Sequence, residues 1–257
     1  MQSSLSPNHA LFEFALFMGD NGLICGHRLS EWTGHGPALE QDIAITNISL
    51  DLIGQATSWL NLAGEVEGKG RSADDLAYFR SDRQYRNFLL TEQPNGDWAM
   101  TIVRQFLFDC FHFEMLQALL NSQDERVVAI AAKSIKEVVY HLRYNSEWMI
   151  RLGDGTVESH RRMQRALKEQ WRFLGELYED QELDQVLAES GISVLPSSLK
   201  QAAFSRMRGV LKEATLKEPA AVTDFKGSGR KGIHSEHLGH LLAVMQSVQR
   251  AYPGQEW

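Results

Sequence analysis

The stretch KEVVYHLRY, residues 136–144, holds the residue types of a metal site at an unusual spacing. In carboxylate-bridged di-iron proteins a Glu precedes a His by three residues, so that both side chains lie on one helical face and reach one metal. Here Glu137 stands four residues before His141, and Val138 occupies the position three before it. The stretch is therefore a metal site, the remains of one, or an ordinary core helix.

A second candidate ligand interrupts the apolar stripe of a neighbouring predicted helix. The stripe consists of Ile102, Phe106, Phe113, Leu116 and Leu120. Asp109 lies on the same face, between the two phenylalanines. A carboxylate in a core stripe is costly unless it is paired, hydrogen-bonded or bound to a metal. Asp109 also precedes His112 by three residues, which is the spacing that His141 lacks.

The first two predicted helices also carry unusual residues near their middles. In the second helix Gln55 stands in an apolar row, with Leu52 three residues before it. In the first helix Cys25 lies on the apolar face. Gly22 and Gly26 leave the first helix thin on one side, so we expect another backbone to approach it closely.

The ligand types at these mid-helix positions are too few for a working metal centre. The positions are Cys25, Leu52, Gln55, Asp109, Val138 and His141. A di-iron bundle uses about four carboxylates and two histidines, and this set contains one of each. Because a metal centre needs its full ligand set and charge balance, the residues favour a buried hydrogen-bonded cluster of Asp109, Gln55 and His141. We expect neither a metal nor a catalytic residue in this chain.

The elements that must position these residues are predicted to be helices almost throughout. Periodicity and turn residues predict long helices over 8–33, 37–66, 97–122, 124–152 and 157–179, and shorter ones over 73–91, 181–190, 197–216 and 234–251. Long helices joined by short turns predict a single all-α domain over residues 1–257, a long antiparallel bundle with additional shorter helices. Residues 218–233 are predicted to be irregular.

Composition excludes several classes of protein. The 257 residues are 43% hydrophobic with a net charge of −7, which argues against a general nucleic-acid binder because phosphate contacts need clustered Lys and Arg. No apolar run reaches the roughly 20 residues of a membrane span. MQSSLSPNHALFEF has no basic region ahead of an apolar one, so we do not expect it to be a secretory signal. Cys25 and Cys110 fit no zinc spacing and are expected to be buried thiols. We expect a cytoplasmic protein.

One helix carries a hint of an obligate partner. Phe106, Phe108, Phe111 and Phe113 encircle it. A helix that is apolar all round is buried on every side. It is therefore either the central helix of the bundle or a helix covered by another subunit.

Several long stretches resemble one known family. They are LFMGDNGLI, HRLSEWTGHGPALEQDIAITNISLDLIGQA, LLTEQPNGDWAMTIVRQF, AAKSIKEVVYHLRYNSEWMIRLGDGT, GRKGIHSEHLGHLLAVMQ and the ending YPGQEW. In these stretches the chain resembles the C-subunit (PaaC) family of bacterial phenylacetyl-CoA epoxidase, from about residue 16 to residue 257. The resemblance implies an all-α, ferritin-like bundle.

The resemblance also implies what became of the metal-site positions. Asp109 and His141 keep ligand-type residues, whereas Leu52 and Val138 stand where a di-iron relative has glutamates. Gln55 stands where such a relative has a His. In the first helix, which lacks a glutamate at mid-length, Cys25 is the matching position. The implied picture is a degenerate site that has lost its metal.

Partners and cofactors are implied outside this chain. The family pattern is a heterodimer with a catalytic A subunit that carries the di-iron centre, a higher assembly of such pairs, and a small B subunit. A reductase with flavin and iron–sulfur groups passes electrons from NADPH, and the complex uses O2 to epoxidise the ring of phenylacetyl-CoA. The C subunit is then a structural, non-catalytic partner. Two alternatives remain open: an active di-iron or iron-binding ferritin-like protein with unusual ligands, and a free-standing helical binding protein.

The segment GSGRKG, residues 227–232, is basic and rich in glycine. It is not a phosphate-binding loop, because that motif ends in Gly-Lys-Ser/Thr and here Ile233 follows Gly232. It is either a flexible linker or a segment that becomes ordered against a partner. In the second case Arg230 and Lys231 are candidates for contacting an acidic partner surface or a coenzyme A phosphate.

Overall fold

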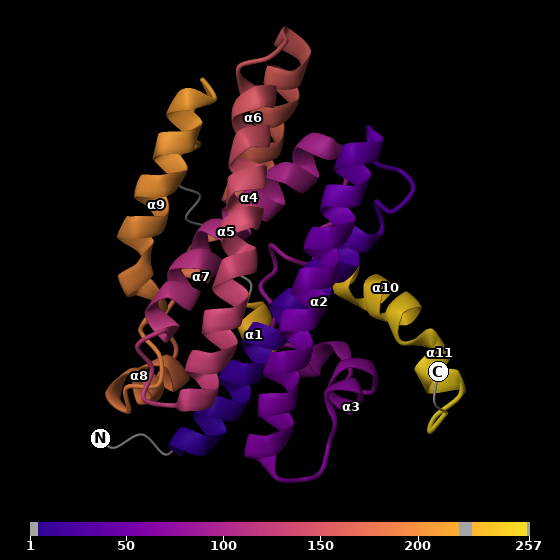
Figure 1. Ribbon diagram of the computed structural model, residues 1–257, viewed down its shortest axis with the longest axis vertical. Helices are drawn as coiled ribbons and strands as arrows, with labels where there is room; N and C mark the ends of the chain where they lie inside the picture. The colour runs from indigo at the N-terminus through magenta and orange to yellow at the C-terminus, as the bar shows by residue number, and fades with distance from the viewer. Residues whose placement is uncertain (1–4, 221–227, 256–257) are drawn as a thin grey trace. The chain divides into compact units, whose positions relative to one another are not determined.

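The computed structural model describes residues 5–220 and 228–255, and within these ranges the chain is all-α, without a strand (Figure 1). The predicted fold class is confirmed. The chain divides into two compact units: unit 1 comprises Met1–Pro94 and Gly227–Trp257, and unit 2 comprises Asn95–Lys226. The single domain predicted over residues 1–257 stays a prediction. Among the described residues, none of the helices combines the length and apolar character needed to span a bilayer.

Unit 1 is built on a hairpin of two long helices, α1 (Pro7–Ser30) and α2 (Leu39–Glu67), which run antiparallel (Figure 1). A Cβ atom at Gly22 would come within 2.9 Å of the Leu52 carbonyl oxygen. The Ser49 hydroxyl donates a hydrogen bond of 2.7 Å to the Gly26 carbonyl. The close approach expected of the first helix is thus confirmed, because its glycines let the α2 backbone reach it.

Shorter elements complete unit 1. They are α3 (Ala73–Tyr78), the 3-10 helices η1 (Asp82–Gln84) and η2 (Gly229–Lys231), α10 (Glu236–Met245) and α11 (Ser247–Ala251). The prediction of a helix over 73–91 is wrong beyond residue 78. Asp20 of α1 accepts hydrogen bonds from the Arg80 side chain at 2.9 Å and from the Arg86 backbone N–H at 2.8 Å. The Arg86 N–H is thus bonded to α1 and cannot donate to a carbonyl within a helix over 73–91.

Unit 2 contains the helices α4 (Trp98–Leu119), α5 (Glu125–Gly153), α6 (Val157–Trp171), α7 (Leu174–Leu177), α8 (Glu182–Glu189) and α9 (Pro196–Glu213) (Figure 1). The unit is built on a second antiparallel pair of long helices, α4 and α5. Asp97 caps α4, since its side chain accepts the Met100 N–H at 3.1 Å. The helix predicted over 157–179 is interrupted after α6. There the Phe173 N–H bonds the Gln170 carbonyl, and this three-residue spacing is that of a turn.

Helix α4 is the central helix of unit 2. It packs against α5, α6 and α9. Phe106, Phe108 and Phe111 are each at most 1% exposed, and the Arg206 guanidinium lies 4.6 Å from the centre of the Phe113 ring. Because this chain itself buries three of the four phenylalanines, those rings do not require another subunit to cover them, and Phe113 is half-buried.

Candidate functional site

Helices α4 and α5 bring a buried carboxylate and two amide side chains together. Asp109 is completely buried. Gln105, one turn earlier in α4, donates from Nε2 to Asp109 Oδ1 at 2.7 Å, and Asn145 of α5 donates from Nδ2 to Oδ2 at 2.8 Å. The same Asn145 nitrogen donates to the His141 carbonyl at 3.0 Å. Neutral amides therefore hold the carboxylate in the core.

Burial sets the protonation of the ionisable groups in this cluster. Burial raises the pKa of Asp109 from 3.8 to about 6, while His141, Gln105 and Asn145 act to lower it. Burial also lowers the pKa of His112 from 6.5 to about 3, and His141 adds to that effect. At neutral pH the Asp109 carboxyl is therefore ionised and His112 is uncharged.

The hydrogen bonds of the cluster do not satisfy all of its polar atoms. His112 Nδ1 and Asn145 Oδ1 are buried and have no hydrogen-bond partner among the described residues. An unsatisfied buried polar atom costs roughly 1–3 kcal/mol. The cluster is thus a polar interruption in an apolar core rather than a closed hydrogen-bond network.

The donor set of α4 and α5 does not fit a di-iron centre. Each oxygen of Asp109 accepts a hydrogen bond from an amide, and the residue three before His141 is the completely buried Val138, which supplies no ligand atom. Across the described residues, no group of three or more His, Cys, Asp and Glu side chains is placed to hold a metal ion. Two irons bridged by carboxylates need about six such side chains.

The remaining predicted positions lie in unit 1. Cys25 in α1 and Leu52 in α2 are completely buried, and Gln55 is 3% exposed. They are thus core positions, as the sequence predicted. The hydrogen bonds found for the Asp109 carboxylate involve Gln105 and Asn145. The grouping of all six positions into one former metal site, and the cluster with Gln55, stay predictions.

The candidate contact residues Arg230 and Lys231 differ in exposure. The irregular segment predicted over 218–233 includes residues 221–227, which lie outside the described residues; residues 228–233 belong to unit 1. The Arg230 guanidinium is buried and lies 4.5 Å from the centre of the Phe17 ring, whereas Lys231 is exposed. A Cβ atom at Gly229 would collide with the Asn87 carbonyl oxygen. Residues 228–233 are therefore packed rather than a flexible linker, and contact with a partner or coenzyme A stays a prediction.

Two polar groups of unit 1 were not predicted from the sequence. One is the buried ion pair between Asp20 and Arg80. The other is Glu92, whose carboxylate accepts hydrogen bonds from Asn87 at 3.0 Å and from the Ser235 N–H and hydroxyl at 2.7 Å each, and contacts His234 Nδ1 at 2.8 Å. The position of Asp20 inside the apolar run LFMGDNGLI was a usable signal. Glu92 lies in a turn, where no periodicity marks a residue as buried.

The fold and the polar cluster define a class: an all-α protein with paired long helices and no complete metal-ligand set in the part that the structure describes. A family model described as phenylacetic acid catabolic protein matches residues 2–257. The chain belongs to this family. Among curated proteins it is similar to the C subunit of 1,2-phenylacetyl-CoA epoxidase from Escherichia coli (strain K12), with 46% identity over 247 residues, which are 96% of this chain and 99% of that relative. The resemblance found in the sequence is confirmed, and a ferritin-like bundle is consistent with the family.

Proposed function

We propose that this chain is the non-catalytic structural subunit of a multicomponent di-iron phenylacetyl-CoA 1,2-epoxidase, acting in aerobic phenylacetate degradation. The similarity to the epoxidase C subunit over nearly the whole of both chains supports this role. The observation that carries it is the state of Asp109, whose two oxygens are held by the side-chain amides of Gln105 and Asn145. A carboxylate engaged in this way serves the packing of α4 against α5.

In the proposed assembly the chain pairs with a catalytic A subunit, which holds the di-iron centre. The oxygenase also includes a small B subunit, and such pairs associate further. A separate reductase supplies electrons from NADPH through flavin and iron–sulfur groups. The contribution of this chain is to support the fold of the catalytic subunit and the site for the coenzyme A thioester.

Co-purification with metal analysis tests the proposal. The chain is expressed alone and together with a catalytic A subunit, and iron is measured in the isolated chain and in the complex. The expected result is a stable complex whose iron stays with the catalytic subunit, and an isolated chain with substoichiometric iron. About two irons per isolated chain, the content of a di-iron site, would instead favour an active or iron-binding protein with unusual ligands. Failure to co-purify would favour a free-standing binding protein.

A further inference from the structure

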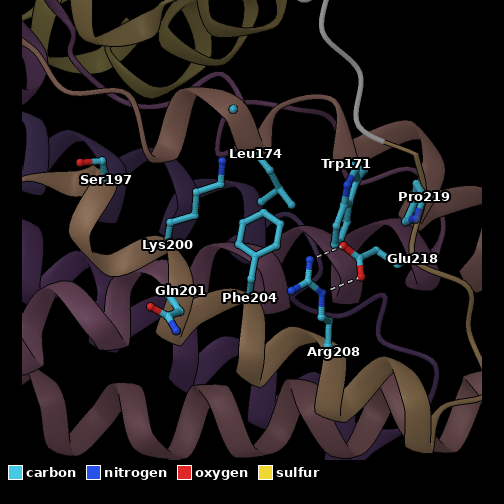
Figure 2. Close-up of a pocket in the computed structure, with 10 residues that line it drawn as sticks. Trp171, Leu174, Ser197, Lys200, Gln201, Phe204, Arg208, Glu218 and Pro219 are labelled. Atoms are coloured by element: carbon cyan, nitrogen blue, oxygen red, sulfur yellow. Dashed lines mark hydrogen bonds and ion pairs between the residues drawn. The ribbon is translucent and has the colours of Figure 1, made fainter.

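Unit 2 contains an open pocket with aromatic side chains in its wall. Its volume is about 650 Å³, and it lies where the end of α6, α7 and α9 meet Glu218 and Pro219 (Figure 2). The Trp171 and Phe204 rings meet edge to face in its wall, with their centroids 5.8 Å apart. A Cβ atom at Gly175 would meet nothing within 4 Å. Pockets of this size accept small organic ligands, and aromatic side chains in the lining favour a flat one.

Two cationic side chains lie near the Phe204 ring. The Lys200 Nζ atom and the Arg208 guanidinium carbon each lie 5.6 Å from the centre of the Phe204 ring. Lys200 makes no ion pair with a carboxylate in the part of the chain that the structure describes. The pocket therefore combines an apolar surface with positive charge, which is the pairing that an aromatic ring with an anionic substituent requires.

Arg208 already holds a carboxylate in the geometry that such a ligand would use. Its Nε donates to Glu218 Oε2 at 2.8 Å and its terminal nitrogen to Oε1 at 3.0 Å (Figure 2). The two side chains are 60% and 35% exposed. Exposed ion pairs contribute little to stability, because water and salt screen them. The Glu218 carboxylate is thus held weakly enough for another anion to take its place.

We propose that this pocket binds a small aromatic anion. The ring packs on Phe204 and Trp171, and its phosphate or carboxylate group replaces Glu218 on Arg208, with Lys200 as the second cation. A guanidinium fork fits carboxylate and phosphate equally well. Two sources supply this chemistry, a nucleotide and an aryl carboxylate. The site goes beyond the proposed structural role and does not depend on it.

Calorimetric titration of the full chain tests the site with four probes. Adenosine monophosphate and phenylacetate carry both a ring and an anion, whereas adenosine and inorganic phosphate each lack one part. At least one of the first two is expected to bind, and more tightly than the fragments. Binding of the nucleotide identifies the first source, and binding of phenylacetate identifies the second.

Three variants tie the binding to this pocket. Arg208→Gln is expected to weaken binding about tenfold or more, because a charge-assisted bidentate contact is lost. Phe204→Leu is expected to weaken it as well. Glu218→Gln is expected to strengthen it, because the competing carboxylate is gone. This gain separates the site from a loss of folding, since a damaged protein would not bind more tightly.

A matched control is available on α6. Arg161 holds Glu158 through two hydrogen bonds of 2.9 and 2.8 Å on an exposed surface outside the pocket. Arg161→Gln should leave binding unchanged. Absence of binding by both aromatic anions at millimolar concentration overturns the proposal. So does binding that Arg208→Gln and Phe204→Leu leave unaltered.

Discussion

Asn145 Nδ2 donates a hydrogen bond of 2.8 Å to Asp109 Oδ2, and this bond joins α5 to α4 in the middle of the unit 2 core. Its acceptor is a carboxylate whose pKa burial raises to about 6. The donor's own oxygen, Asn145 Oδ1, has no partner among the described residues. The two helices are therefore connected by a buried charge that the fold tolerates.

The raised pKa of Asp109 predicts that the stability of the protein depends on pH. The pKa of Asp109 rises from 3.8 in the unfolded chain to about 6, so the folded state binds more protons between these values and its stability falls as pH rises through them. Asp109→Asn should remove this loss, which is on the order of 1–3 kcal/mol. Urea unfolding at about pH 5 and pH 7.5 measures it. Glu158→Gln is the control. The pKa of that exposed carboxyl is lowered to about 2, so the group does not titrate between about pH 5 and pH 7.5. Equal slopes for Asp109→Asn and the parent chain would contradict the prediction.

His112 predicts the opposite dependence in acid. Burial lowers its pKa to about 3 from 6.5, so the unfolded state binds the proton first and stability falls as pH drops below about 6.5. Its ring lies 5.0 Å from that of Phe108. His112→Phe should therefore shift the midpoint of acid unfolding to lower pH. His9 is exposed, so His9→Gln should leave the midpoint of acid unfolding unchanged. An unchanged midpoint in His112→Phe would show that His112 does not contribute to acid unfolding.

The glycines of the α1–α2 hairpin predict a pair of opposite effects. A Cβ atom at Gly22 would lie 2.9 Å from the Leu52 carbonyl oxygen, whereas one at Gly54 would meet nothing within 4 Å. Gly22→Ala should destabilise the protein by about 1–3 kcal/mol through backbone displacement. Gly54→Ala should stabilise it by about 0.5–1 kcal/mol through helix propensity. Thermal unfolding compares them, and equal changes in both variants would rule out close packing as the cause.

The sequence predicted long helices better than it predicted polar contacts, for a physical reason. Helix α5 carries a clear 3.6-residue apolar repeat, and α1, α2 and α4 are long apolar stretches between turn residues; these signals are local, so the sequence reveals them. The segment after α3 follows hydrogen bonds to Asp20, which lies 60 or more residues away in the chain. Asp109 could be identified as buried because it interrupts a stripe. Gln105 and Asn145 could not be identified as its hydrogen-bond partners, because the pairing of α4 with α5 places Asn145 beside Asp109.

The ion pair of Asp20 and Arg80 predicts a large and partner-dependent loss. Both side chains are at most 3% exposed, and Asp20 also accepts the Arg86 N–H at 2.8 Å. Asp20→Asn alone, or Arg80→Met alone, leaves one buried group without its partner and should cost about 3–5 kcal/mol. The double variant should cost less than the sum of the two. Arg161 is exposed, so Arg161→Gln should leave stability nearly unchanged. Strict additivity in the double-mutant cycle would contradict the coupling.

Val138 allows the predicted loss of a metal-ligand spacing in α5 to be tested directly. Val138→Glu places a carboxylate three residues before His141, the spacing that di-iron helices use. Because Val138 is completely buried, that carboxylate should destabilise the protein by more than Val138→Ala, whose core loss is on the order of 1 kcal/mol or more. Added Fe(II) or Co(II) should not restore the melting temperature, because Asp109 remains held by Gln105 and Asn145 and the donor set stays incomplete. Thermal unfolding with and without metal measures this. A metal-dependent rise confined to Val138→Glu would instead mean that one substitution separates this core from a metal site.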